Sequence, residues 1–191
     1  GITTFWLIET AVPLFKFVYR NWRHAGGNIF FTLTTIVINF FLAFILLSSS
    51  DWVVQQGVGI LQWVSMPLWA TAIAGLMLMD LIGAYTPHWA EQRVPVLWRF
   101  HIVHHTDQNV DTTSANRHHP GESVIRFVFT TAAVIIVGAP IWLVFLYQSL
   151  SVVLCQFNHA NLRVPNWLNT GLGWLFDMPD LHRVHHQYKL P

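Results

Sequence analysis

The sequence contains few charged residues and a single cysteine. Asp, Glu, Lys and Arg make up 10% of the 191 residues, whereas they make up about a quarter of a typical soluble protein. Cys155 is the only cysteine, which excludes an intrachain disulfide and a cysteine-ligated iron–sulfur cluster. The sequence also lacks a Gly-rich nucleotide fingerprint, a haem-attachment motif and the His-Glu-x-x-His motif of zinc hydrolases. The low content of charged residues argues against a soluble protein. The missing motifs argue against a nucleotide site, a covalently attached haem and the site of a zinc hydrolase.

Long uncharged stretches separate the few charges. Residues 25–50, 52–79 and 127–162 contain no Asp, Glu, Lys or Arg, and a helix of about 20 apolar residues can cross a bilayer. The third stretch is long enough for two crossings, with a tight hairpin at Pro140. We therefore predict an all-α integral membrane protein with four transmembrane helices and a cytoplasmic, histidine-rich metal-binding cap.

The predicted segments form a single membrane domain, 1–191. They are an interfacial helix at 1–24, transmembrane helices at 29–47, 67–87, 123–139 and 141–159, and histidine-rich polar segments at 88–122 and 160–191. We expect the residues from Ser48 to Asp51 to end the first transmembrane helix. The following residues, 52–66, are too polar for a transmembrane helix and indicate an interfacial or re-entrant segment.

Basic residues fall on one side of this topology. They precede the first span, lie between the second and third, and follow the fourth: Lys16, Arg20, Arg23, Arg93, Arg99, Arg117, Arg126, Arg163, Arg183 and Lys189. The segments on the opposite face contain no Lys or Arg. Because positively charged loops are retained in the cytoplasm, we expect both termini and every histidine cluster on the cytoplasmic side.

The histidines are grouped and regularly spaced. His101, His104 and His105 form a His-x-x-His-His pattern, and the chain has a second copy near its end at residues 182, 185 and 186. In a helix this spacing places the three imidazoles on one side. Solvated loop histidines, or a polar cluster satisfied by the backbone, are the alternative. Two copies of the pattern in a chain with so few charges favour metal ligation, for which imidazole is well suited.

Four stretches carry a resemblance to a known family. They are LWRFHIVHH at 97–105, NRHHPGE at 116–122, FNHAN at 157–161 and HRVHH at 182–186. Together they resemble the fatty acid hydroxylase and sterol desaturase superfamily. The resemblance implies a membrane enzyme with two histidine-ligated iron ions. Such an enzyme uses O2 and two external electrons to hydroxylate or desaturate a C–H bond of a fatty acyl, sterol or carotenoid lipid.

The resemblance also implies a set of metal ligands. Matched position by position, they are His88, His101, His104, His105, His119, His159, His182, His185 and His186. His118 falls at a variable position and His24 has no counterpart, so we interpret both as bystanders. Asp80 is either a second-shell partner of a ligand histidine or an ordinary interfacial carboxylate, and Asn161 is expected in the second shell.

Gln92 departs from the family pattern, because it stands where the first box has its second histidine. It is a weak or replaced ligand, and three hypotheses follow. Water or a neighbour fills the position, the site binds one metal, or the protein has lost catalysis. In the last case it acts as a structural or lipid- or pigment-binding subunit of a membrane complex. For the enzyme, the expected electron donor is a separate cytochrome b5-like protein, ferredoxin or reductase, and no nucleic acid partner is expected.

Overall fold

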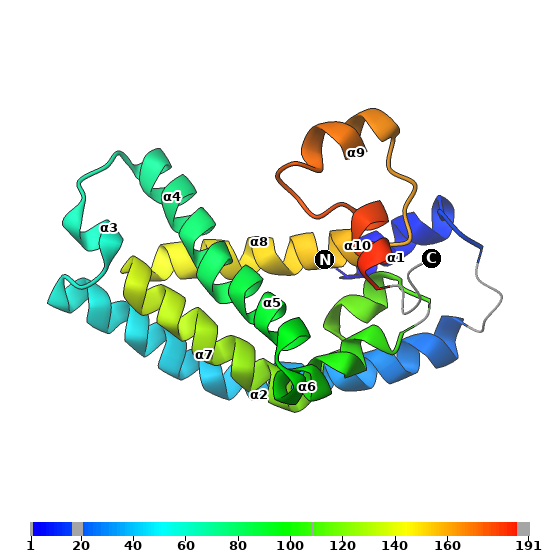
Figure 1. Ribbon diagram of the computed structural model, residues 1–191, viewed down its shortest axis with the longest axis horizontal. Helices are drawn as coiled ribbons and strands as arrows, with labels where there is room; N and C mark the ends of the chain where they lie inside the picture. The colour runs from blue at the N-terminus through cyan, green and yellow to red at the C-terminus, as the bar shows by residue number, and fades with distance from the viewer. Residues whose placement is uncertain (1, 17–20, 108, 187–191) are drawn as a thin grey trace. The chain divides into compact units, whose positions relative to one another are not determined.

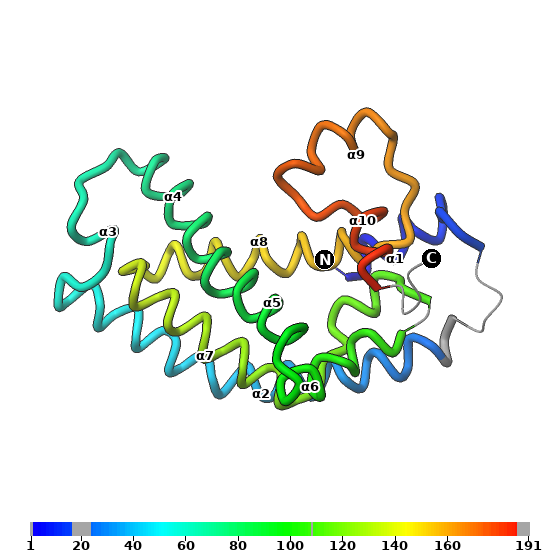
Figure 2. The backbone as a smooth tube through the Cα atoms, in the orientation of Figure 1, coloured from blue at the N-terminus to red at the C-terminus, as the bar shows by residue number. Residues whose placement is uncertain are grey.

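The computed structural model describes residues 2–16, 21–107 and 109–186, and their regular secondary structure is helical, with no β-strand among them. The trace in Figure 2 follows the helices along the chain. Four helical stretches are long and apolar enough to cross a membrane: His24–Trp63, Leu68–Arg93, Pro120–Val137 and Ile141–His159. This confirms the all-α class and the presence of four span-length helices, while the membrane boundaries and the side of each segment remain predictions.

The chain divides into two compact units. The terminal unit comprises Gly1–Leu33, Ile102–Arg117 and Ser151–Pro191, and the hairpin unit comprises Thr34–His101 and His118–Leu150. Three helices contribute residues to both units: α2 (Asn21–Gln56), α6 (Pro95–His105) and α8 (Ile141–His159).

The terminal unit also contains four short elements. They are α1 (Ile2–Ala11), the 3-10 helix η2 (Thr112–Asn116), α9 (Asn166–Leu172) and α10 (Pro179–His185). Glu9 of α1 is 5% exposed and joins α1 to η2, because its Oε2 accepts from the Thr112 amide at 3.0 Å and the Thr112 hydroxyl at 2.8 Å. The same oxygen accepts from the Asn161 amide at 2.9 Å.

The segment predicted as an interfacial helix over 1–24, with a kink expected at Pro13, is interrupted there, and its interfacial position remains a prediction. Helix α1 ends at Ala11, and Pro13 instead forms an isolated antiparallel bridge with Leu162. Proline lacks the amide hydrogen that an interior helical position requires. Residues 17–20, including Arg20, and residues 187–191, including Lys189, lie outside the described residues.

The hairpin unit contains the remaining elements. They are α3 (Ile60–Trp63), α4 (Leu68–Asp80), the π-helical turn η1 (Leu81–Tyr85), α5 (Thr86–Arg93) and α7 (Pro120–Val137), all labelled in Figure 1 except η1. Its core is apolar, and Met79, Val134 and Leu143 are fully buried in it. Gly75 allows close packing of α4 against α8, because a Cβ at this position would lie 2.4 Å from a Leu143 methyl group.

The first long helix does not end at the residues we predicted. Helix α2 continues through Ser48 to Asp51 and ends at Gln56. The buried Ser50 hydroxyl donates to the Ala139 carbonyl at 2.7 Å, so this polar residue is satisfied inside a helix. Gly57, at φ +63°, follows the helix in the left-handed conformation that glycine adopts readily.

Candidate metal centre

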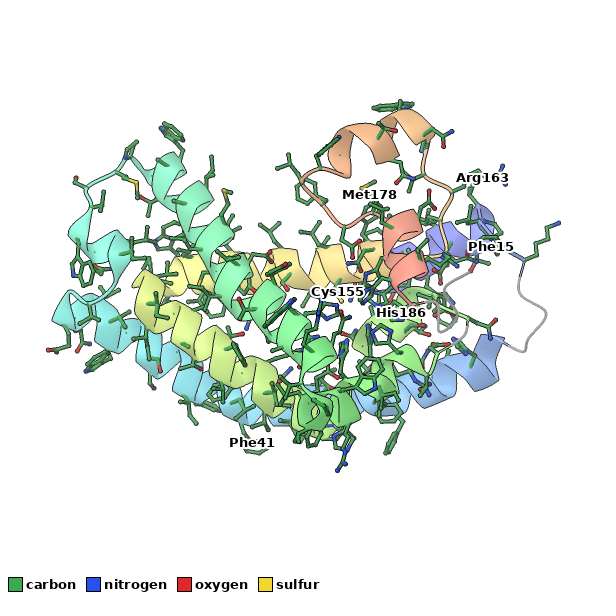
Figure 3. The ribbon with its side chains drawn as sticks, viewed as in Figure 1. Phe15, Phe41, Cys155, Arg163, Met178 and His186 are labelled. Carbon is green, nitrogen blue, oxygen red and sulfur yellow. The ribbon has the colours of Figure 1, made fainter. Side chains whose placement is uncertain are left out.

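Four histidines converge in the terminal unit. His104 of α6, His159 at the end of α8, and His182 and His186 of the α10 segment each place a ring nitrogen within 4.8 Å of the others. We call them the tetrahistidine cluster. Their exposed fractions are 2–6%, so the group lies away from solvent. Figure 3 labels His186 and Cys155 of this unit.

Two of these imidazoles have a defined proton position. The Nδ1 atom of His159 lies 2.7 Å from both the Cys155 carbonyl and the Asn158 side-chain oxygen. The Nδ1 atom of His182 contacts the Asp177 carboxylate. These oxygens can only accept, so Nδ1 carries the proton in both neutral rings and each Nε2 presents a lone pair.

The two lone pairs face each other. The Nε2 atoms of His159 and His182 lie 3.0 Å apart, and two acceptors at this distance cannot bond to each other. A cation between them would turn this repulsion into two metal–ligand bonds. The arrangement matches the rule that a ligating histidine donates its other N–H to a carboxylate, carbonyl or similar acceptor.

The spacing of the cluster fits an imidazole-bound metal. Successive Nε2 atoms are separated by 3.0 Å from His104 to His159, 3.0 Å from His159 to His182 and 3.1 Å from His182 to His186. Two nitrogens bound at about 2.1 Å and at right angles to each other lie about 3.0 Å apart. The cluster is therefore suited to adjacent positions of one coordination sphere.

The other two predicted ligands of this unit lie beside the cluster. The His105 ring stacks on His186 with centroids 4.5 Å apart, and it lies 4.9 Å from the His185 ring. The structure thus brings together all six predicted ligands of the terminal unit.

The hairpin unit holds a second group of candidate donors. His88 of α5 and His101 of α6 have ring centroids 4.8 Å apart. Glu91, His101 and Glu122 each offer a ligand atom within 4.8 Å of the others, and all three are fully buried. We call these three residues the carboxylate cluster. Burial lowers the pKa of His101 by disfavouring the imidazolium form, and a neutral ring is the form that binds metal.

Hydrogen bonds orient this cluster. The Nδ1 of His101 lies 3.0 Å from Glu122 Oε1, which also accepts from Arg126 Nε at 2.9 Å. Arg126 Nη2 donates to Glu91 Oε2 at 3.0 Å and lies 3.4 Å from His88 Nδ1. With Nδ1 of His101 donating to Glu122, Nε2 is the ring nitrogen that carries the lone pair.

Gln92 lies beside His88, as expected for residues one helical turn apart. Its side-chain nitrogen is 3.2 Å from His88 Nε2, and Gln92 is exposed.

His119 has a different local role from the other predicted ligands. It is the N-cap of α7, and its Nδ1 accepts from the Gly121 amide at 3.0 Å. Within the described residues, His119 belongs to none of the donor groups that could hold a metal.

The two predicted second-shell residues form no hydrogen bond with a histidine among the described residues. Asp80 is exposed at the end of α4, and among the described residues it forms no hydrogen bond with a histidine. Asn161 is buried, but its side chain donates to the Phe15 carbonyl at 2.8 Å and accepts from the Phe15 amide at 3.1 Å. It ties the N-terminal segment to the end of α8, a contact that spacing in the sequence does not reveal.

The two presumed bystander histidines also take part in buried networks. His118 Nδ1 lies 2.9 Å from Glu122 Oε1, and His24 Nε2 lies 3.2 Å from Asp107 Oδ2. Burial works against ionisation of Asp107, but hydrogen bonds from His24 and Ser114 outweigh it and hold the pKa of Asp107 below its usual value. Asp107 therefore remains a carboxylate in the folded terminal unit.

Sequence reasoning missed the groups that orient or accompany the histidines. These are Asp177, Asn158, Glu91, Glu122 and Arg126. Glu91 and Glu122 stand among the few acidic residues of an apolar chain, and this scarcity was a usable signal. Asp177 and Asn158 carried no comparable signal, because polar residues near a histidine are common in loops.

Span-length helices and clustered buried imidazoles define a class: histidine-rich, multi-pass membrane proteins with side chains able to hold metal. Within this class, residues 72–191 match the sequence model of the family described as fatty acid hydroxylase. The match covers more than half of the chain, and the chain belongs to the fatty acid hydroxylase family. The resemblance predicted from the histidine stretches is thereby confirmed.

One relative is the ornithine lipid hydroxylase OlsE of Rhizobium tropici. It is 25% identical to this chain over 126 residues, which are 65% of this chain and 36% of that protein. The chain thus spans about a third of the length of this relative. No solved structure matches the chain.

Proposed function

We propose that this chain is a membrane-bound, iron-dependent oxygenase that hydroxylates or desaturates a C–H bond of a lipid. Family membership supports a lipid hydroxylase-type reaction. The observation that carries the proposal is the pair of Nε2 lone pairs of His159 and His182, 3.0 Å apart in a buried group of four imidazoles. Donors of this type suit non-haem iron.

The residues of the terminal unit would prepare the site in two ways. Asp177, Asn158 and the Cys155 carbonyl hold the Nδ1 protons, so that the Nε2 atoms face inward. Burial of the imidazoles excludes bulk water, which strengthens binding of a cation and limits side reactions. Iron held there would supply the activation of O2, with two electrons from a separate cytochrome b5-like protein, ferredoxin or reductase.

Our proposal includes two iron ions and a lipid substrate. The chemistry of the donors does not select among fatty acyl, sterol and carotenoid lipids. The name of the relative adds ornithine lipids to the substrates worth testing. We further propose that both termini and the histidines lie on the cytoplasmic side, from the distribution of Lys and Arg.

Gln92 favours a second candidate, a family member without catalysis that acts as a structural or lipid-binding subunit. An exposed amide stands one turn from His88, and an amide is a poorer donor to iron than imidazole. Under this alternative the protein could bind lipid without changing it.

One experiment separates the two candidates. Iron is quantified in detergent-purified protein, and lipids are extracted from cells with and without the chain. The oxygenase predicts bound iron and a lipid that gains an oxygen atom or loses two hydrogens, both lost in His104→Ala and retained in His24→Ala. Bound iron with an unchanged lipid profile under O2 and an added reductant would favour the subunit. Iron-free, folded wild-type protein would overturn the proposal.

A further inference from the structure

Glu91 is a fully buried carboxylate with one unused oxygen. Its Oε2 accepts from Arg126 at 3.0 Å, but Oε1 has no hydrogen-bond partner among the described residues. The residue lies on α5, three positions after His88 and directly before Gln92. A buried carboxylate oxygen without a partner is unfavourable, so this atom points to a ligand that binds here.

The surroundings of Glu91 are those of a cation site. A ligand atom of Glu91 lies within 4.8 Å of ligand atoms of His101 and Glu122. Glu91 and Glu122 are both 0% exposed and share one guanidinium, that of Arg126. When both carboxylates are ionised and the histidines are neutral, Arg126 leaves one negative charge of this cluster unbalanced. A bound cation would compensate that charge.

The two carboxylates differ in how their oxygens are used. Oε1 of Glu122 already faces Nδ1 of His101 and Nε of Arg126, so Glu122 orients the His101 ring. Each carboxylate has one buried oxygen without a hydrogen-bond partner among the described residues, Oε1 of Glu91 and Oε2 of Glu122. Glu122 also contacts His118, whereas the one hydrogen bond of Glu91 comes from Arg126. Glu91 therefore has fewer contacts to lose and is the better placed of the two for direct ligation.

We propose that Glu91 is a metal ligand and supplies the donor that Gln92 cannot. The hairpin unit would then bind iron through imidazole from His88 and His101 together with a carboxylate, a donor combination that suits non-haem iron with open positions. This inference rests on the proposed function, since it concerns the ligands of the same iron-dependent enzyme. It would explain how the chain tolerates an amide in its first histidine box.

The test measures iron per folded chain in Glu91→Gln, with Asp80→Asn as the matched control. Glutamine keeps an oxygen that can accept from Arg126 but loses the anionic donor. We expect the iron content of Glu91→Gln to fall by about half, as one of two metals is lost. We expect Asp80→Asn to match the wild type, because Asp80 is exposed and without a hydrogen-bond partner among the described residues.

A second substitution tests for rescue. If Glu91 replaces the missing imidazole, Gln92→His added to Glu91→Gln should restore the iron content. Should Glu91→Gln not fold, Glu91→Asp keeps the charge opposite Arg126 but shortens the side chain, and we expect more than about tenfold weaker iron binding. Unchanged iron binding in a folded Glu91 variant, or no rescue by Gln92→His, would overturn this inference alone. Iron-free wild-type protein would instead overturn the proposed function.

Discussion

At the scale of single residues, the hydrogen-bond partner of Nδ1 decides whether the Nε2 of an imidazole carries a lone pair that can bind a metal. His159 and His182 each direct one N–H toward a protein oxygen, which leaves Nε2 as a lone pair for a metal. His119 uses its Nδ1 to cap a helix. Residues of one type in similar sequence motifs therefore have different local roles.

The Asp177 carboxylate should matter for iron affinity. Asp177→Asn replaces a charged acceptor by an amide, which weakens the hold on the His182 ring and lowers its donor strength. We expect roughly 10- to 100-fold weaker iron binding, the usual effect of losing such a partner. Iron titration of the apo-protein measures it. Asp180→Asn is the control, because Asp180 contacts Asn169 instead of a histidine; an equal loss in both variants would contradict the assigned role.

At the scale of elements, Glu9 links α1, η2 and the end of α8. Burial raises the pKa of Glu9 above its usual value near 4.5, and this outweighs the hydrogen bonds from Asn161 and Thr112 that act in the opposite direction. The folded state therefore holds this proton at a higher pH than the unfolded state does. The stability that this proton contributes is complete below about pH 4.5 and is lost as pH rises through the raised pKa.

Glu9→Gln should reduce this pH dependence, because glutamine resembles the protonated carboxyl and does not titrate. In detergent, the unfolding midpoint of the wild type should fall relative to that of Glu9→Gln as pH increases above 4.5. Thermal unfolding followed by circular dichroism measures the difference. Asp51→Asn, an exposed carboxylate in α2, should follow the wild type. A constant difference between wild type and Glu9→Gln at all pH values would refute the linkage.

The turn after α2 packs directly against the end of α7. Gly59 has φ +104°, and a Cβ there would lie 2.2 Å from the Gly138 amide nitrogen. Gly59→Ala therefore adds a backbone clash to an unfavourable conformation, and we expect a loss of at least about 2 kcal/mol in unfolding free energy. Unfolding in detergent is the measurement. Gly26→Ala in α2 meets no atom within 4 Å and should be neutral or stabilising; similar losses in both variants would contradict this explanation.

At the scale of the whole molecule, the distribution of basic residues predicts the topology. In a Cys155→Ala background, Gln55→Cys should react with a membrane-impermeant maleimide on intact cells. Arg163→Cys and Arg99→Cys should react only after permeabilisation, since both lie in segments predicted to be cytoplasmic. All three positions are exposed. Labelling of Gln55→Cys and Arg163→Cys from the same side would rule out the four-span arrangement.

Uncharged runs and histidine spacing in the sequence were enough to predict the helical membrane class and to single out the candidate metal ligands. Uncharged runs such as 127–162 exceed what a soluble domain contains, and repeated His-x-x-His-His spacing places imidazoles on one helix face whatever surrounds them. The same pattern could not show that α2 continues past Ser50. That serine is satisfied by the Ala139 carbonyl, which lies far away in the chain.

The partners of the site residues depended on the tertiary structure. The sequence left Asp80 as either a histidine partner or an ordinary interfacial carboxylate, and in the structure it is exposed. Asn161 binds the Phe15 backbone. Glu91 had no predicted role, yet it is fully buried beside Arg126. Hydrogen bonds between residues dozens of positions apart depend on how helices pack, and packing has no periodicity in the sequence. Spacing along one helix shows which side chains share a face, whereas only the folded chain shows which oxygen meets each ring nitrogen.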